Sequence, residues 1–134
     1  MTRKNQFERP SRLLVDLDRL AQNVQLIRKR LRRKTNLMAV VKAGGYGHGA
    51  LPVAKVALAS GASCLGVAFV EEGIALRKAG IKVPIAVLYP DFPDRAVFFA
   101  RYDLIPTIID ENFGRAYVRT AAKLRKKKIP FAVK

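Results

Sequence analysis

The residues best suited to chemistry lie in one short run, where an apolar stretch ends in a lysine and continues into glycines. The run is Met38-Ala-Val-Val-Lys42-Ala-Gly-Gly-Tyr46-Gly-His48-Gly49-Ala50. An ammonium group at the end of a buried strand is costly to desolvate, and this cost favours the neutral amine, which attacks aldehydes. Lys42 is therefore a candidate to form a Schiff base.

The glycines that follow this lysine are suited to holding an anion. Glycines at positions 44, 45, 47 and 49 allow positive φ and let bare N–H groups approach a ligand. Tyr46 adds a hydroxyl donor for a phosphate oxygen, and a helix opening near Ala50 adds the positive end of its dipole. The residues alone leave a structural alternative open, in which Lys42 reaches solvent, Tyr46 packs and the glycines only form a turn. His48 taken by itself is interpreted as a hydrogen-bonded loop residue.

Strands and helices must position these residues. From residue 12 onward, the chain alternates short apolar runs with segments of helical period. This alternation is typical of βα units around a parallel sheet, whose strands are buried on both faces. The apolar runs are Leu13 to Leu17, Leu37 to Lys42, Cys64 to Phe69, Ile85 to Leu88, Ile105 to Ile109 and Phe131 to Val133.

Between the apolar runs, capping and punctuating residues predict helices. Leu20, Val24, Ile27 and Leu31 form one apolar face, and Asp18 is placed to cap that helix. The predicted helices span about 19–33, Pro52 to Gly61, Glu71 to Ala79, Asp94 to Arg101 and Glu111 to Lys127.

The fold class that follows is α/β with a parallel sheet. Right-handed crossovers would lay consecutive strands side by side. Two closures agree with the spacing: a small open sheet, or the first five strands of an eight-stranded (β/α) barrel, which needs ~250 residues. In both, ligands bind at the carboxyl ends of the strands.

Composition sets the class of protein. The chain has 134 residues, 50% of them hydrophobic, which predicts one domain or a piece of one. It contains no apolar run long enough for a membrane span and no signal peptide, so we expect a soluble, unexported protein without a membrane partner. The lone Cys64 sits in an apolar run and is interpreted as a small buried hydrophobe, so neither a disulfide framework nor a metal site is expected.

The charge is strongly basic, with 26 Lys and Arg against 10 Asp and Glu and a formal net charge of +16. Such an excess attracts polyanions. Two runs, 28–34 and 123–128, hold much of it and fall at the ends of predicted helices, where cations are favoured and well solvated. A nucleic-acid-binding module is an alternative, but no binding motif or row of stacking aromatics accompanies the runs, so nucleic acid is not the expected partner.

The stretch Val-Val-Lys42-Ala-x-x-Tyr46-Gly-His-Gly49 resembles the cofactor-lysine signature of alanine racemases. The resemblance continues, in the order of that family, through nearly the whole chain from residue 12. The further matching stretches are Leu14-Val-Asp-Leu-Asp18-Arg-Leu, Gly61-Ala-Ser-Cys-Leu-Gly-Val-Ala68, Val70-Glu-Glu-Gly-Ile-Ala-Leu-Arg77-Lys-Ala-Gly-Ile81, Pro84-Ile-Ala-Val-Leu88 and Tyr102-Asp-Leu-Ile-Pro-Thr107.

The resemblance implies an eight-stranded α/β barrel of the TIM type, followed by a mostly β domain and assembled as a homodimer. Residues 12–134 would then form an incomplete barrel with about five strands, truncated before the later strands and the β domain. Residues 1–11 are expected to be a flexible N-terminus. Because such a sheet leaves strand edges unpaired, the isolated piece is expected to self-associate.

By the same resemblance, Lys42 binds pyridoxal phosphate as a Schiff base and is the base that acts on the Cα–H of D-alanine. Tyr46 hydrogen-bonds the phosphate, and Val40 and Leu88 line the cofactor pocket. Lys134, which closes Ile-Pro-Phe-Ala-Val-Lys, falls where the family has a lysine that is often carbamylated.

The implied activity is the interconversion of L-alanine and D-alanine in the cytoplasm, supplying D-alanine for peptidoglycan. In the family, a tyrosine of the partner subunit and other groups in later segments complete the site, so this segment alone is expected to be inactive. Gly44-Gly45 departs from the usual Asn or Asp followed by a small residue, and is expected to loosen the turn before Tyr46. A related amino-acid racemase and a non-catalytic pyridoxal-phosphate-binding protein are the alternatives.

Overall fold

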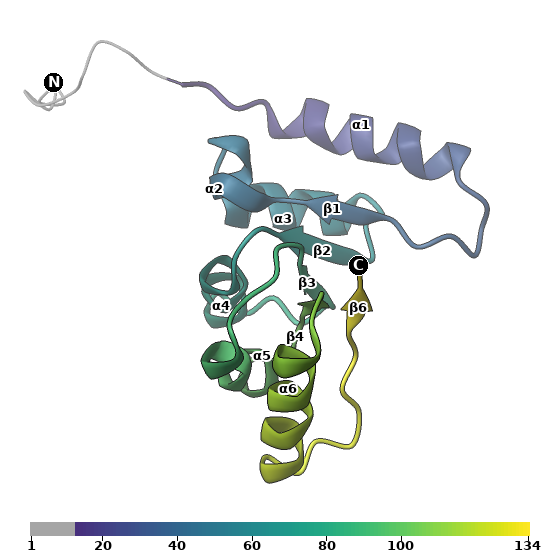
Figure 1. Ribbon diagram of the computed structural model, residues 1–134. Coiled ribbons are helices and arrows are strands. Elements are labelled where there is room, and N and C mark those ends of the chain that lie inside the picture. The colour runs from purple at the N-terminus through teal and green to yellow at the C-terminus, as the bar shows by residue number, and fades with distance from the viewer. Residues whose placement is uncertain (1–12) are drawn as a thin grey trace, which may run out of the picture.

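In the computed structural model, which describes residues 13–134, the apolar runs form short parallel strands joined by helices (Figure 1). The N-terminus expected to be flexible lies outside the described residues. The strands are β1 (Met38–Val40), β2 (Cys64–Val67), β3 (Ile85–Val87), β4 (Leu104–Ile105), β5 (Thr107–Ile108) and β6 (Ala132–Val133). The helices are α1 (Leu17–Arg30), α2 (Lys42–Tyr46), α3 (Ala50–Ala59), α4 (Val70–Lys78), the 3-10 turn η1 (Pro93–Arg95), α5 (Ala96–Arg101) and α6 (Glu111–Lys123).

The first four strands form one parallel sheet in chain order, β1-β2-β3-β4. Met38 pairs with Cys64 across β1 and β2, and Ile85 pairs with Leu65 on one side and Leu104 on the other. The expectation that consecutive strands lie side by side is confirmed, as right-handed βα crossovers require.

The predicted strand at 105–109 is divided in two by Pro106. This proline has no N–H to give to a ladder, and its carbonyl oxygen accepts a bond from the Ala132 amide at 2.9 Å. The hydroxyl of Thr107, which is buried, donates to the Val87 carbonyl oxygen at 2.8 Å and so extends the link to β3. Beyond the proline, β5 pairs in parallel with β6. The chain therefore supplies five positions of a parallel sheet, which confirms an α/β fold of the incomplete-barrel type.

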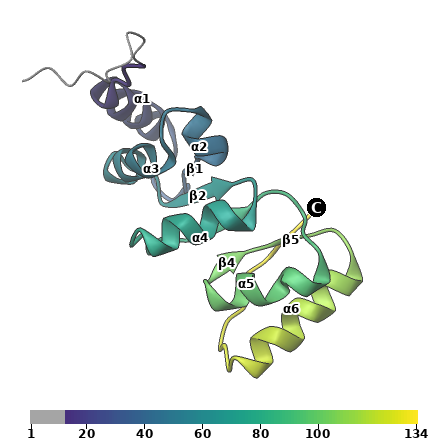
Figure 2. The ribbon, with the colours of Figure 1, turned by 90° about the vertical axis from the view of Figure 1, so that its left-hand side faces the viewer.

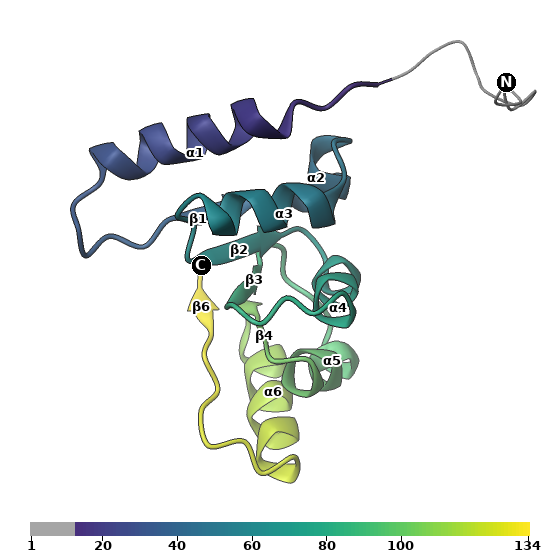
Figure 3. The same cartoon turned by 180° about the vertical axis from the view of Figure 1, so that it is seen from behind.

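Among residues 13–134, the helices that pack on the sheet lie on one side of it. Helices α3, α4, α5 and α6 follow one another along its outer side, as Figures 2 and 3 show from two directions. On β1, Ala39 packs against the core while Met38 and Val40 remain 40% and 39% exposed on the other face. The largest buried side chains include Phe99 and Phe113, whose rings meet edge to face at 5.4 Å.

The predicted strand Leu13 to Leu17 is wrong. Leu13 and Leu14 are 71% and 87% exposed, and the residues before α1 have no strand partner in the part of the chain that the structure describes. Asp16, not Asp18, caps the helix, since its carboxylate accepts the Arg19 amide at 2.9 Å. Because Asp16 caps the helix, α1 begins two residues earlier than expected.

The last helix is shorter than predicted, ending at Lys123 and not Lys127. Arg125 adopts a left-handed conformation, with φ of 52°, and the Lys126 amide bonds back to the Ala121 carbonyl oxygen at 3.0 Å. A left-handed residue other than glycine closes the helix here, so the usual glycine stop signal is missing from the sequence.

Arg77 ties two loops together at the amino ends of the strands. Its guanidinium donates to the carbonyl oxygens of Ile81, Val83, Tyr102 and Asp103 at 2.7 to 3.0 Å. Burial lowers the pKa of Arg77, and the four carbonyl oxygens satisfy the buried charge. This end of the sheet is therefore held by a fixed structural cation.

Close packing of α4 on the sheet depends on Gly73. A Cβ at this position would lie 2.9 Å from a methyl carbon of the fully buried Leu104, whereas a Cβ at Gly114 in α6 would lie 3.5 Å from Ile108, an ordinary contact. We predict that Gly73→Ala lowers the free energy of unfolding by about 1 to 3 kcal/mol through overpacking. The matched variant Gly114→Ala should stay near wild type or gain up to about 1 kcal/mol from helix propensity. Urea unfolding of both variants tests this; equal stabilities would show that Leu104 moves aside freely.

Candidate active site

Lys42 lies at the carboxyl edge of the sheet, directly after β1. The buried Val41 extends the ladder by donating its amide to the Gly66 carbonyl oxygen at 2.8 Å. Lys42 itself is half-buried, and its Nζ lies 5.4 Å from the centroid of the Tyr89 ring. Tyr89 follows β3 and packs on Phe69, which follows β2, with ring centroids 5.5 Å apart. The Lys42 side chain is therefore directed across the ends of neighbouring strands, with its terminal nitrogen over an aromatic face.

The residues after Lys42 form a left-handed turn. Ala43, Gly44, Gly45 and Tyr46 have φ of 51°, 64°, 68° and 56°. L-residues with a side chain adopt this conformation at a cost, whereas glycine adopts it freely. The two glycines that depart from the family pattern thus occupy positions where glycine is unstrained. A bond of 2.7 Å from the Gly49 amide to the Gly44 carbonyl oxygen closes the turn.

His48 is bound locally within this turn. Its Nδ1 lies 3.0 Å from the Gly45 carbonyl oxygen and donates to it, while the His48 amide bonds to the same oxygen at 3.1 Å. The interpretation of His48 as a hydrogen-bonded loop residue is confirmed.

Glu72, in the first turn of α4, binds three backbone amides at the strand ends. Its Oε1 accepts from Ala43, the residue after the candidate lysine, at 2.6 Å. Its Oε2 accepts from Ala68 at 2.7 Å and from Phe69 at 3.2 Å. One carboxylate therefore joins the end of β1 to the end of β2 and to the start of α4. Glu72 was not predicted as a site residue from the sequence; its position three residues after the helix cap was the available signal.

Val40 and Leu88 meet on the open face of the sheet, at Gly66 of β2. A Cβ built on this glycine would lie 3.3 Å from Val40 Cγ2, 3.3 Å from Leu88 Cδ1 and 3.1 Å from Met38 Sδ. The absence of a side chain at 66 lets these groups converge into an apolar floor beside the strand ends.

The other predicted site residues lie at the same end of the sheet and are more exposed. Tyr46, on the left-handed turn, is 59% exposed. Lys134 follows β6, and its amide bonds to the Ile108 carbonyl oxygen at 3.2 Å. Lys42 and Lys134 thus follow the first and last described strands, β1 at an edge of the four-stranded sheet and β6 in the two-stranded sheet.

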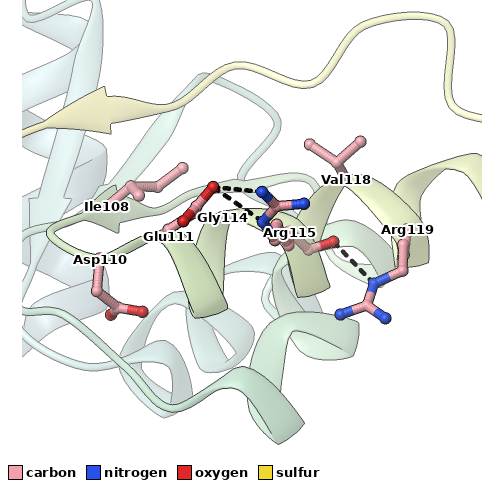
Figure 4. A pocket seen from close by; sticks show the side chains of 7 residues that line it. All are labelled: Ile108, Asp110, Glu111, Gly114, Arg115, Val118 and Arg119. Atoms are coloured by element: carbon pink, nitrogen blue, oxygen red, sulfur yellow. Dashed lines mark hydrogen bonds and ion pairs between the residues drawn. The ribbon is translucent and has the colours of Figure 1, made fainter.

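A separate pocket of about 600 Å³ lies along α6, away from Lys42 (Figure 4). It is lined by Ile108, Asp110, Glu111, Gly114, Arg115, Val118 and Arg119. Arg115 is paired with Glu111 across one helical turn, and Val118 is half exposed. In a complete (β/α) barrel each helix packs beside the next, and this flank of α6 is open among residues 13–134.

A metal site and a membrane-spanning helix have no support among residues 13–134. This part of the chain contains no group of three or more His, Cys, Asp or Glu arranged to hold a metal ion, and no helix long and apolar enough to cross a bilayer. Cys64 is a free, partly buried thiol.

The role of Glu72 can be tested without reference to ligand. Glu72→Gln keeps the side-chain size but removes one acceptor oxygen and the charge, so the Ala43 and Ala68 amides should exchange with solvent about tenfold faster in hydrogen-exchange NMR. Glu71→Gln is the matched control, because Glu71 pairs with Arg95, whose hydrogen bond lowers the pKa of Glu71. Unchanged exchange in Glu72→Gln would contradict the bridging role.

Comparison with known proteins agrees with this geometry. Residues 15–134 match the sequence model of the family described as "Alanine racemase, N-terminal domain". The chain is 52% identical over 95 residues to the alanine racemase of Nostoc sp., covering 70% of this chain and 25% of the relative. It superposes on the crystal structure of alanine racemase from E. faecalis with a TM-score of 0.80 and 35% identity, covering 96% of this chain and 34% of that one.

A further structural match is alanine racemase from Bacillus anthracis with bound L-Ala-P, with a TM-score of 0.73 and 38% identity over 89% of this chain and 30% of that one. The chain thus spans a quarter to a third of the length of these relatives. Its parallel βα units correspond to part of their TIM barrel. The chain belongs to the alanine racemase N-terminal domain family.

Proposed function

We propose that this chain is the cofactor-binding part of a pyridoxal-phosphate-dependent alanine racemase, which interconverts L-alanine and D-alanine. The observation that supports this most is the position of Lys42, half-buried at the carboxyl end of β1 with its amine over the Tyr89 ring. Ligands of parallel α/β folds bind at this edge. The alanine racemases of Nostoc sp. and E. faecalis are among the proteins that match the chain.

The residues at this edge fit the chemical parts of pyridoxal phosphate. The aldehyde requires an amine, which Lys42 supplies. The ring requires an apolar surface, and Val40 and Leu88 form one where Gly66 leaves space. The phosphate requires donors, for which the exposed Tyr46 hydroxyl is available on the turn.

When bound, pyridoxal phosphate supplies a conjugated ring that accepts the electrons left on Cα of alanine after proton loss. Lys42 Nζ is the atom that removes the proton of D-alanine on one face, or returns it. Glu72 keeps this amine in place because it holds the Ala43 amide beside it. The left-handed turn positions Tyr46 relative to the same lysine.

Racemisation also needs a second acid–base group on the opposite face of the substrate. We assign it to the partner in a homodimer, in agreement with the family resemblance. Lys134, at the end of β6, is proposed as the lysine that takes up carbon dioxide as a carbamate. We further propose that the enzyme acts in the cytoplasm and supplies D-alanine for peptidoglycan.

Borohydride reduction in the presence of pyridoxal phosphate tests the assignment of Lys42. We predict one dominant labelled peptide, carrying Lys42, and a loss of at least about tenfold in labelling for Lys42→Arg, since an arginine cannot form the Schiff base. Lys55→Arg, at an exposed lysine of α3, is the matched control and should label like wild type. Peptide mapping by mass spectrometry gives the readout. Labelling spread over many surface lysines, with no preference for Lys42, would remove the support for this function.

A further inference from the structure

The charged residues of this chain are separated between the two ends of the sheet. Loops that enter strands, and the helix ends before them, contain six cations in 28–34, three in 77–82, Arg101 and five in 123–128, fifteen in all. The same segments contain one carboxylate, Asp103. The other eight acidic residues among 13–134 lie in first helical turns or in loops that leave strands, at the end that holds Lys42.

The topology of the fold explains why these cations gather. In successive parallel βα units every helix runs back along its strand, so the carboxyl ends of the helices lie at the amino end of the sheet. In Figure 1, α1 begins near α2 and ends at the opposite side, where β1 starts. We call this side of the molecule the amino face, made of residues 28–34, 77–82, 101–103 and 123–128.

Helix dipoles and fixed partners within the chain account for only part of this positive charge. Each helix end carries about half a negative elementary charge, so the five helices that end here offset about two to three cations. Three further cations have fixed partners: Arg28 donates to the Arg33 and Thr35 carbonyl oxygens, Arg77 is bound by carbonyl oxygens, and Lys126 pairs with Asp103 at 2.6 Å.

Most of the remaining cations are exposed to solvent and free of carboxylates. In the first run these are Lys29, Arg30, Arg32, Arg33 and Lys34, and in the second Lys123, Arg125, Lys127 and Lys128. Across residues 13–134, no ion pair joins any of these nine to an acidic side chain. Their mutual repulsion is a cost that an external polyanion relieves.

We propose that the amino face binds the phosphate backbone of a nucleic acid, without regard to base sequence, while the opposite end of the sheet carries the cofactor. The two richest runs precede β1, an edge of the four-stranded sheet, and β6, in the two-stranded sheet that follows it, so an extended polyanion can contact both and a small anion cannot. Neither run contains an aromatic residue, which disfavours both base stacking and insertion into a membrane surface. The acidic residues at the cofactor end repel the same polymer and orient it.

The test uses the whole chain and a fluorescein-labelled DNA duplex of about 20 base pairs, with anisotropy recorded over a range of salt concentrations. The amino-face variant carries Lys29→Gln, Arg30→Gln, Arg32→Gln and Arg33→Gln. The control variant carries Arg19→Gln, Lys55→Gln, Arg115→Gln and Arg119→Gln, four exposed cations outside the amino face. Both variants lower the net charge by the same four units, from +16 to +12.

The amino-face variant should bind the duplex at least about tenfold more weakly, and its logarithmic salt slope should fall by about 3, while the control changes affinity less than about threefold. Equal losses in both variants would show that binding follows net charge and would overturn the proposal. Absence of duplex binding by the unmodified chain, or competition by phosphatidylserine vesicles at equal charge concentration, would overturn it too.

Discussion

The site depends on one carboxylate that gathers the ends of two strands. Glu72 accepts hydrogen bonds from the amides of Ala43, Ala68 and Phe69, which belong to the end of β1, the end of β2 and the cap of α4. Charge-assisted bonds of this kind are stronger than neutral ones. Because Ala43 is covalently next to Lys42, this contact fixes the backbone from which the reactive amine extends.

The turn and the floor of the site depend on where side chains are missing. Positive φ at residues 44 and 45 is unstrained because both are glycines, and the chain can then reverse within a few residues of Lys42. On the open face of β2, the missing side chain at Gly66 lets Val40 and Leu88 approach each other. Rigid strands carry these groups, and glycines set the space between them.

The sequence predicted the features that depend on local pattern. The apolar runs located the strands from β1 onward, and the lysine followed by glycines located the site, because strand burial and backbone freedom are properties of neighbouring residues. Features set by distant contacts were missed. In the sequence, Glu72 does not differ from other acidic residues in first helical turns. Only the fold places the Ala43 amide beside it. Pro106, which has no N–H, divides its strand, and the part after it pairs with β6, far along the chain. Leu13 to Leu17 has a strand-like composition but pairs with none of the strands that the structure describes.

We propose that the turn held by Glu72 presents Lys42 to pyridoxal phosphate at the carboxyl end of β1. A crystal structure of the chain grown with pyridoxal phosphate tests this arrangement. We expect continuous density from Lys42 Nζ to the cofactor, the ring beside Val40 and Leu88, and Glu72 still bound to the Ala43 amide. Density for the cofactor on another lysine, with Lys42 directed into bulk solvent, would contradict it.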